Sequence, residues 1–368
     1  LAAYANYKRR EAKDPAAAGR LYEQQLQLGQ TGTAAYEQYA WLLAAELNDP
    51  VKSRIMYEMA AEQGSANAYT ALGRYYAQGF GVEKNIQKAL AYYQQAAAQE
   101  YAPAQFAIGL IYQNGQELGQ NFKQANDWFT RASRNNYSDA ILYLGYNYEH
   151  GQGVSKDMQQ AAQCYAQAAE LDNAVAQYNL GILYELGNGV EQDAQKAFAC
   201  FRQAAERGYA SAIFQTGWCL HFGKGVAIDY KQAMEWYQRS AVRHEPKALV
   251  QIGVLYHEGL GVEKNLDKAK SYYQQALDKS EFAHYQLGRL LYEQTDYASA
   301  WEPLKKAADK QVAGAQRLIA YYYLNGYAPV IKNAKKALKW FERAAQKNDA
   351  IAQYELGDMY DNRIGVMQ

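Results

Sequence analysis

The sequence predicts an all-α protein, a right-handed superhelix of about nine to ten helix-pair repeats. Two residue types that recur at a fixed spacing predict this fold. Glycine recurs every 36 residues at Gly73, Gly109, Gly145, Gly181, Gly217 and Gly253. Alanine recurs with the same spacing at Ala89, Ala125, Ala161, Ala197, Ala233 and Ala269. A fixed period of this length is typical of solenoids, in which each repeat packs mainly on its neighbours.

The first half of each repeat has the pattern of an amphipathic helix. In residues 174–186, Ala176, Leu180 and Tyr184 recur at i, i+4 and i+8, which places them on one helical face. Gly181 lies beside Leu180. Glycine inside a helix costs about 1 kcal/mol relative to alanine. Its recurrence therefore predicts that the second helix of the repeat crosses the first at this point.

A G-x-G-V loop follows the first helix. It occupies residues 187–190 and recurs at 79–82, 151–154, 223–226 and 259–262. Glycine at the end of a helix supplies the left-handed C-cap that turns the chain. A phosphate-binding loop would need a strand before it and Lys-Ser/Thr after it, and neither is present. The loop is therefore interpreted as a turn.

The second helix is introduced by an Asn or Asp four residues before the marker alanine. Such residues are N-caps, whose side-chain oxygens accept the free N–H groups of the helix. We expect this role, rather than a catalytic one, at Asp49, Asn85, Asn121, Asp157, Asp193, Asp229, Asn265, Asp296 and Asn333.

The three cysteines, Cys164, Cys200 and Cys219, are too few and odd in number for a disulfide framework. Cys164 and Cys200 occupy a second-helix position that is aromatic in other repeats. We expect them to be small buried side chains that replace core aromatics.

These repeated residues resemble the Sel-one-like repeat (SLR) family, which is related to tetratricopeptide repeats. The family pattern runs A-x-A-x-x-x-L-G-x-x-Y, G-x-G-V, N/D-x-x-K-A, an aromatic pair and A-A-x-x-G, and residues 174–208 match almost every position. We expect an N-terminal cap with irregular repeats over 1–65, six regular repeats over 66–280, and divergent repeats with a truncated last one over 281–368, all in one continuous solenoid.

Several segments depart from the pattern. Gly115–Leu118 replaces G-x-G-V, so that loop is expected to differ locally. Residues 281–311 are shorter and joined in tetratricopeptide fashion, and Ala320 replaces the repeat glycine. Residues 350–368 begin another repeat and stop inside its loop, so we expect the natural protein to continue. Residue 1 is Leu, so a removed signal or lipid anchor stays open.

Composition and motifs argue against several functions. The formal net charge is zero, which gives no electrostatic reason for nucleic-acid or anionic-lipid binding. No apolar run approaches the roughly 18 residues of a membrane span. Neither G-x-S-x-G nor H-E-x-x-H is present, so no enzyme and no cofactor is expected.

One row of residues imitates a metal site, and it comprises Glu149, Glu185, His221 and His257. Neighbours in this row are one solenoid step, about 10 Å, apart. Ligands must lie about 2.1 Å from one metal ion. We therefore interpret the row as a polar stripe and expect no metal.

A binding surface is suggested by the position after each repeat glycine and the position one turn later. In the middle repeats these positions hold the pairs Tyr146/His150, Ile182/Leu186 and Trp218/Phe222, whereas at the ends they are polar. Exposed aromatic side chains are frequent binding anchors. We expect residues 143–222 to form a partner groove, lined by Tyr143, Tyr146, His150, Ile182, Leu186, Trp218 and Phe222. The alternative is that these side chains pack on the adjacent repeat.

The resemblance to SLR proteins implies a non-catalytic scaffold or adaptor that binds a protein or peptide on its concave face. It also implies a bacterial protein of the periplasm, the cell envelope or the secreted fraction rather than the cytoplasm, with a toxin or an envelope complex among the candidate partners. The alternative function is that of an immunity protein, which binds and neutralises a toxic effector enzyme such as a phospholipase.

Overall fold

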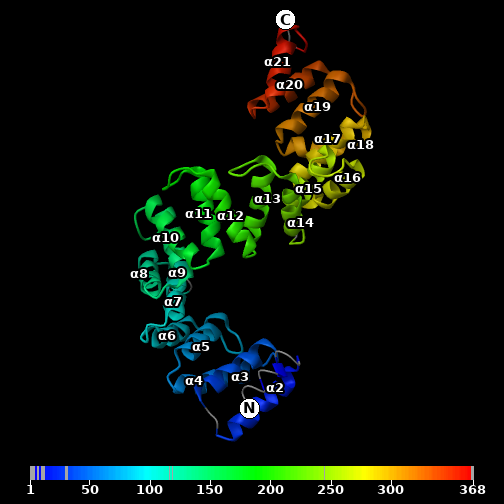
Figure 1. Ribbon diagram of the computed structural model, residues 1–368. Coiled ribbons are helices and arrows are strands. Elements are labelled where there is room, and N and C mark those ends of the chain that lie inside the picture. The colour runs from blue at the N-terminus through cyan, green and yellow to red at the C-terminus, as the bar shows by residue number, and fades with distance from the viewer. Residues whose placement is uncertain are drawn as a thin grey trace. The chain divides into compact units, whose positions relative to one another are not determined.

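The computed structural model describes residues 5, 8–9, 13–29, 32–115, 117, 119–243 and 245–365. Within these ranges the chain forms twenty α-helices and one short 3-10 helix, and it contains no strand, which confirms the all-α prediction (Figure 1). The helices form two compact units, residues 1–192 and 193–368.

The first unit contains the helices α2 (Pro15–Gln27), α3 (Thr33–Ala45), α4 (Pro50–Glu62), α5 (Ala66–Gln78), α6 (Ile86–Ala97), α7 (Ala102–Asn114), α8 (Phe122–Ser133), α9 (Ser138–His150), α10 (Met158–Glu170) and α11 (Ala174–Leu186). Consecutive helices pack as pairs, α3 on α4, α5 on α6, α7 on α8 and α9 on α10. Each pair is one repeat, so the helix bounds confirm the period found in the sequence.

The second unit contains α12 (Ala194–Glu206), α13 (Ala210–Phe222), α14 (Tyr230–Ala241), α15 (Pro246–Glu258), α16 (Leu266–Gln275), the 3-10 helix η1 (Leu277–Lys279), α17 (Glu281–Glu293), α18 (Tyr297–Asp309), α19 (Ala313–Asn325), α20 (Ala334–Gln346) and α21 (Ala350–Asp361). Pairing continues as α13 on α14, α15 on α16, α17 on α18 and α19 on α20. The short joint between α17 and α18 confirms the tetratricopeptide-like connection expected there.

The predicted N-caps are confirmed at all nine positions. Each side chain accepts a hydrogen bond from the backbone N–H near the start of its helix, as in Asn85 with Lys88 N at 2.8 Å and Asp229 with Gln232 N at 2.9 Å. The other caps are Asp49, Asn121, Asp157, Asp193, Asn265, Asp296 and Asn333. The role of these side chains is therefore to cap helices.

The repeat glycine lies where an aromatic ring of the second helix crosses the first. A Cβ atom at Gly145 would stand 2.8 Å from the ring of Tyr165, and one at Gly253 would stand 2.5 Å from the ring of Tyr273. The same contact recurs at Gly73, Gly109 and Gly217. Because carbon atoms pack at about 3.5–4.0 Å, only glycine admits the ring at this distance.

The second glycine of the G-x-G-V loop has a different role, which sequence reasoning missed. Gly189 and Gly225 both have φ of +70°. A Cβ atom there would lie 2.1 Å from the carbonyl oxygen of Met158 and 1.8 Å from that of Ala194, respectively. Met158 and Ala194 begin the second helix of the preceding repeat. Each of these G-x-G-V loops therefore packs against the start of the second helix of the preceding repeat.

The irregular loop differs locally, as expected. Gly115 forms the left-handed cap with φ +67°, Glu117 has φ +56°, and a Cβ atom on Gly119 would meet nothing within 4 Å. Glu117 occupies the position that Gly189 has in its own repeat, so this loop lacks the second glycine of the G-x-G-V pattern. Gln116 and Leu118 of the predicted segment lie outside the described residues.

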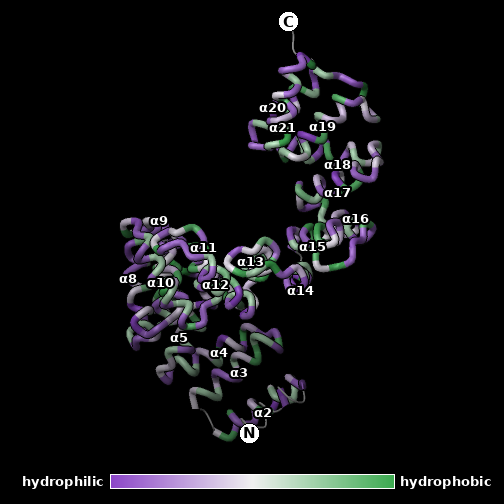
Figure 2. The backbone as a smooth tube through the Cα atoms, turned by 45° about the horizontal axis from the view of Figure 1, so that its top comes forward, coloured by the Kyte–Doolittle hydropathy of each residue, from purple (hydrophilic) through white to green (hydrophobic). Residues whose placement is uncertain are grey.

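Apolar and polar residues alternate along the helices (Figure 2). In the part of the chain that the structure describes, no helix is both long enough and apolar enough to cross a bilayer. The apolar side chains lie instead between the paired helices, in cores such as the one built by Ala233, Tyr237, Ala248 and Leu255.

Candidate functional site

In the first unit, the residues of the predicted strip lie on α9 and α11. Tyr146 is 40% exposed, and its ring stacks on that of His150 with centroids 4.0 Å apart. The Nδ1 atom of His150 lies 2.9 Å from the carbonyl oxygen of Tyr146. One repeat further, Leu186 is 59% exposed, whereas Ile182 is half-buried. Both pairs therefore present apolar surface to solvent.

Tyr143 lies differently from the other strip residues. Its ring is half-buried, and its centroid lies 5.4 Å from those of both Phe106 and Phe129. Phe129 is completely buried. Part of the Tyr143 ring is therefore engaged in core packing, as the alternative interpretation of the strip expects.

In the second unit, Trp218 and Phe222 lie on α13. Their ring centroids are 4.2 Å apart, and Phe222 is 44% exposed. Trp218 lines a hollow of about 470 Å³ between α13, α15 and the start of α17, together with Phe214, Val250 and Phe282. Phe282 is itself 41% exposed. The sequence columns that predicted the strip do not include Phe214 or Phe282, because neither position follows a repeat glycine.

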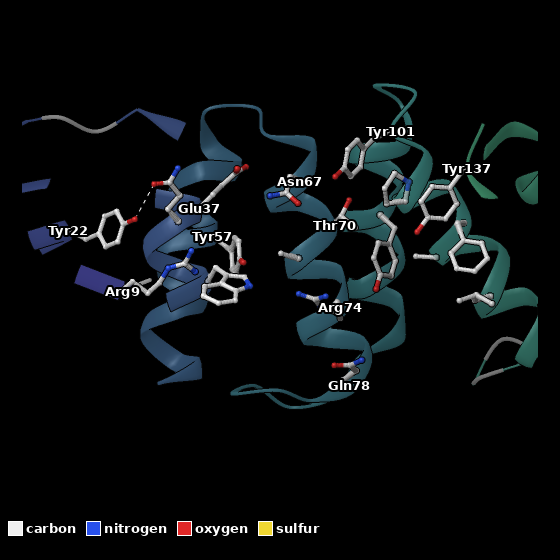
Figure 3. Close-up of a pocket in the computed structure, with 18 residues that line it drawn as sticks. Arg9, Tyr22, Glu37, Tyr57, Asn67, Thr70, Arg74, Gln78, Tyr101 and Tyr137 are labelled. Carbon is white, nitrogen blue, oxygen red and sulfur yellow. Dashed lines mark hydrogen bonds between the residues drawn. The ribbon is translucent and has the colours of Figure 1, made fainter. Parts of the chain in front are cut away.

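The first unit has a larger hollow, of about 790 Å³, which is lined mainly by the first helices α3, α5 and α7 (Figure 3). Arg74 of α5 lies near its middle, between Arg9 and Tyr57 on one side and Tyr101 and Tyr137 on the other. The charged residues that line it are Arg9, Arg74 and Glu37. Arg74 follows the repeat glycine Gly73, as Tyr146 follows Gly145 in the middle repeats. The change from an apolar to a polar residue at this position was the sequence signal that could have pointed to the hollow.

Two tyrosines bring hydroxyl groups to this hollow from its buried wall. Tyr57 and Tyr93 are each 5% exposed, and both line the hollow. Burial raises the pKa of Tyr57 and of Tyr93 to about 12, although the nearby charge of Arg74 acts in the opposite direction. Both hydroxyls therefore stay protonated at neutral pH and can donate hydrogen bonds.

The apolar part of the same hollow includes Trp41, which is 44% exposed. The guanidinium of Arg9 lies 4.5 Å from the centroid of the Trp41 ring, in a cation–π arrangement. Phe106 and Leu110 of α7 line the hollow as well. The site thus combines aromatic walls with polar donors.

The predicted polar stripe is wrong in the second unit, because His221 and His257 are buried and bonded to core tyrosines. His221 is 5% exposed, and its Nδ1 atom lies 3.2 Å from the hydroxyl of Tyr237. His257 is 1% exposed and lies 3.3 Å from the hydroxyl of Tyr273 and 3.0 Å from Glu293 Oε2. Burial lowers the pKa of His221 to about 4 and also lowers that of His257.

In the first unit, Glu149 occupies the same repeat position and also bonds to a buried tyrosine. The hydroxyl of the fully buried Tyr165 donates to Glu149 Oε2 at 2.6 Å. The row therefore satisfies the buried tyrosine hydroxyls of the second helices. Among the described residues, no three His, Cys, Asp or Glu side chains are grouped so as to hold a metal ion.

The cysteines are free, with Cys219 buried and Cys164 and Cys200 half-buried. Burial raises the pKa of Cys164 and of Cys200 to about 11. Since the thiolate is the reactive form of cysteine, both are poor nucleophiles at neutral pH.

Paired helices in a fixed repeat, with aromatic side chains and hollows along the first helices, define a helical-repeat protein of the class that binds other proteins. The repeats also identify the family. The Sel1 repeat model matches residues 42–65, 66–101, 102–137, 138–173, 174–209, 210–241, 246–280, 313–349 and 350–368. The chain therefore belongs to the Sel1 repeat family, whose members generally act as non-catalytic scaffolds for protein–protein interaction.

Solved structures agree with this assignment. A protective antigen of uropathogenic Escherichia coli strains, which displays an SLR fold, is 27% identical, and the match covers 100% of this chain and 84% of that one with a TM-score of 0.81. A Sel1 repeat protein from Oxalobacter formigenes is 29% identical over 66% of this chain and 96% of that one, with a TM-score of 0.55.

An immunity protein from Pseudomonas aeruginosa is also similar, at 23% identity over 67% of this chain and 81% of that one. Its TM-score of 0.39 supports no inference about function. A comparison with curated protein sequences found no match.

Proposed function

We propose that this chain is an adaptor that binds a protein partner along its first helices, with Tyr146 and Leu186 as apolar anchors in the first unit and Trp218 and Phe222 as apolar anchors in the second. The observation that supports this most is the pair Trp218 and Phe222 on α13. The half-buried Trp218 lines a hollow between α13, α15 and α17, and the neighbouring Phe222 is 44% exposed. Large aromatic side chains next to a recess are typical of interaction hot spots. In the first unit, His150, Ile182 and Tyr143 add to the surface around Tyr146 and Leu186.

In this proposal the chain is a bacterial protein of the periplasm, the cell envelope or the secreted fraction. A toxic effector enzyme is one partner class, and the chain would then serve as an immunity protein. A subunit of an envelope complex is the other. The two classes differ in the contact that they need, because neutralising an enzyme favours a large interface, whereas an adaptor needs only a peptide groove.

The test is affinity capture with the full chain from the native organism, beside a Tyr146→Ala/Trp218→Ala double variant. The captured protein is identified by mass spectrometry, purified, and titrated against each variant. Loss of a hot-spot aromatic costs about 2 kcal/mol or more, so we expect the affinity to fall roughly 30-fold.

Val242→Ala and Ile331→Ala are matched controls, because these apolar side chains are 80% and 87% exposed but lie outside the strip. They should leave the affinity unchanged. Equal affinity of the wild-type chain and the double variant would contradict the assignment of the binding surface. A captured toxin whose activity falls on binding would select the immunity function, and a captured envelope subunit would select the adaptor.

A further inference from the structure

The hollow in the first unit has more positive charge than its own residues neutralise. Arg74 is exposed, and none of the described residues forms an ion pair with it. The carboxylate of Glu37, which lines the same hollow, accepts a hydrogen bond from the hydroxyl of Ser65. Arg9 packs on Trp41, and its guanidinium lies 3.9 Å from a carboxylate oxygen of Glu46. Arg74 is therefore the exposed charge of this hollow that a ligand can reach without displacing an ion pair.

Two hydroxyls beside Arg74 also lack partners. Neither Tyr57 nor Tyr93 forms a hydrogen bond through its hydroxyl to a described residue, although each residue is only 5% exposed. Tyr57, Tyr93 and Arg74 line the same hollow. The other buried core tyrosines described above, Tyr165, Tyr237 and Tyr273, each have a partner for the hydroxyl. At the hollow that partner is missing.

We propose that this hollow binds an extended acidic segment of a protein partner, with an Asp or Glu carboxylate accepting hydrogen bonds from Arg74, Tyr57 and Tyr93. A guanidinium matches a carboxylate in geometry and can bind it through two parallel hydrogen bonds. Hydrogen bonds to a charged acceptor are also the strong ones. The proposal rests on the proposed function, since it assumes that the chain binds a protein.

The size and walls of the hollow suit a peptide rather than an isolated ion. Its volume of about 790 Å³ lies in the range of ligand pockets, which is about 300–1,000 Å³. Trp41 and Phe106 offer apolar surface to the side chains that flank the carboxylate. The amides of Asn67 and Gln78 line the same space and can bond to peptide groups.

The test uses the full chain and a phage library of random linear peptides. We expect the retained peptides to share an Asp or Glu next to an apolar residue. One such peptide is then synthesised with a fluorophore, together with its Asp→Asn or Glu→Gln analogue, and titrated by fluorescence anisotropy. Loss of a charged hydrogen bond costs about 1.5–3 kcal/mol, so Arg74→Gln and the amide analogue should each weaken binding at least about tenfold.

Two further variants remove only the donors, because Tyr57→Phe and Tyr93→Phe keep the buried rings. Each should weaken binding severalfold, while the circular dichroism and the melting temperature stay those of the wild type. Arg134→Gln is the matched control, since Arg134 is an exposed arginine at the end of α8. It should bind the peptide as the wild type does.

The proposal is overturned if no peptide is retained, if the retained peptides lack an acidic residue, or if Arg74→Gln binds them as tightly as the wild type. Those results would leave the proposed function standing wherever the partner is still lost with Trp218→Ala. Conversely, a peptide that binds at Arg74, together with a partner whose affinity is unchanged by the strip variants, would support binding in the hollow and contradict binding at the strip.

Discussion

Replacing Gly253 by alanine tests the central packing rule of the repeat. The new Cβ atom would lie 2.5 and 2.7 Å from Cε1 and Cδ1 of Tyr273. That ring is 0% exposed, and its hydroxyl is held 3.3 Å from His257 Nδ1, so it has little freedom to withdraw. Overpacking of this kind costs about 1–3 kcal/mol.

Alanine also recovers about 1 kcal/mol of helix propensity, which offsets part of the loss. Because the two contacts are far below van der Waals distance, we expect Gly253→Ala to lower the free energy of unfolding by about 2 kcal/mol. The measurement is urea unfolding followed by circular dichroism, with hydrogen exchange of α15 to localise the change.

The chain offers a matched control at the same position of another repeat. Gly357 lies on α21, and a Cβ atom there would meet nothing within 4 Å. Gly357→Ala should therefore stabilise α21, by about 0.4–1 kcal/mol. If Gly253→Ala were as stable as the wild-type chain, or if both variants lost stability equally, ring crossing would not be the reason for the glycine.

Three further predictions concern other buried contacts. Asn147 is fully buried and exchanges two 3.0 Å hydrogen bonds with the side chain of Gln113, so Asn147→Ala should lower the free energy of unfolding by about 2 kcal/mol, measured by urea titration. Gly225→Ala forces a Cβ atom to 1.8 Å from the oxygen of Ala194 at φ +70° and should cost at least about 3 kcal/mol, with earlier proteolysis at that loop as the readout. The pKa of His221 is about 4 in the folded chain, below the usual 6.5, so the unfolded chain binds the proton at higher pH. The free energy of unfolding should therefore fall as the pH drops from about 6.5 to about 4, by up to about 3 kcal/mol. His221→Phe should flatten that part of the pH profile of the melting temperature, and an unchanged slope would contradict the assignment.

Periodicity predicted most of the fold, because helix, loop and cap are each local properties of the chain. The N-caps and the crossing at the repeat glycine are examples, since an Asn before a helix or a glycine within one has few physical explanations. The second loop glycine was assigned only to turning the chain, because its contact with Met158 or Ala194 joins two repeats and leaves no local signal.

The candidate site was less predictable for the same reason. The exposure of Tyr146 and Phe222 could be predicted from their positions in the repeat. The hollow beside Arg74 could not, because it is lined by side chains from several helices and its depth depends on how those helices pack. The environment of His221 was missed because a column of two Glu followed by two His has the composition of a polar stripe. Its partner, the hydroxyl of Tyr237, lies 16 residues away on the second helix.

The loop glycines also constrain how such a chain can change in length. The carbonyl of Met158 touches Gly189, and that of Ala194 touches Gly225, at the same separation of 31 residues. Inserting or deleting a single residue within this span would move the glycine away from the backbone it must meet. Adding or removing a whole repeat keeps every such spacing intact. Growth and loss by complete repeats are therefore the changes that this architecture tolerates best.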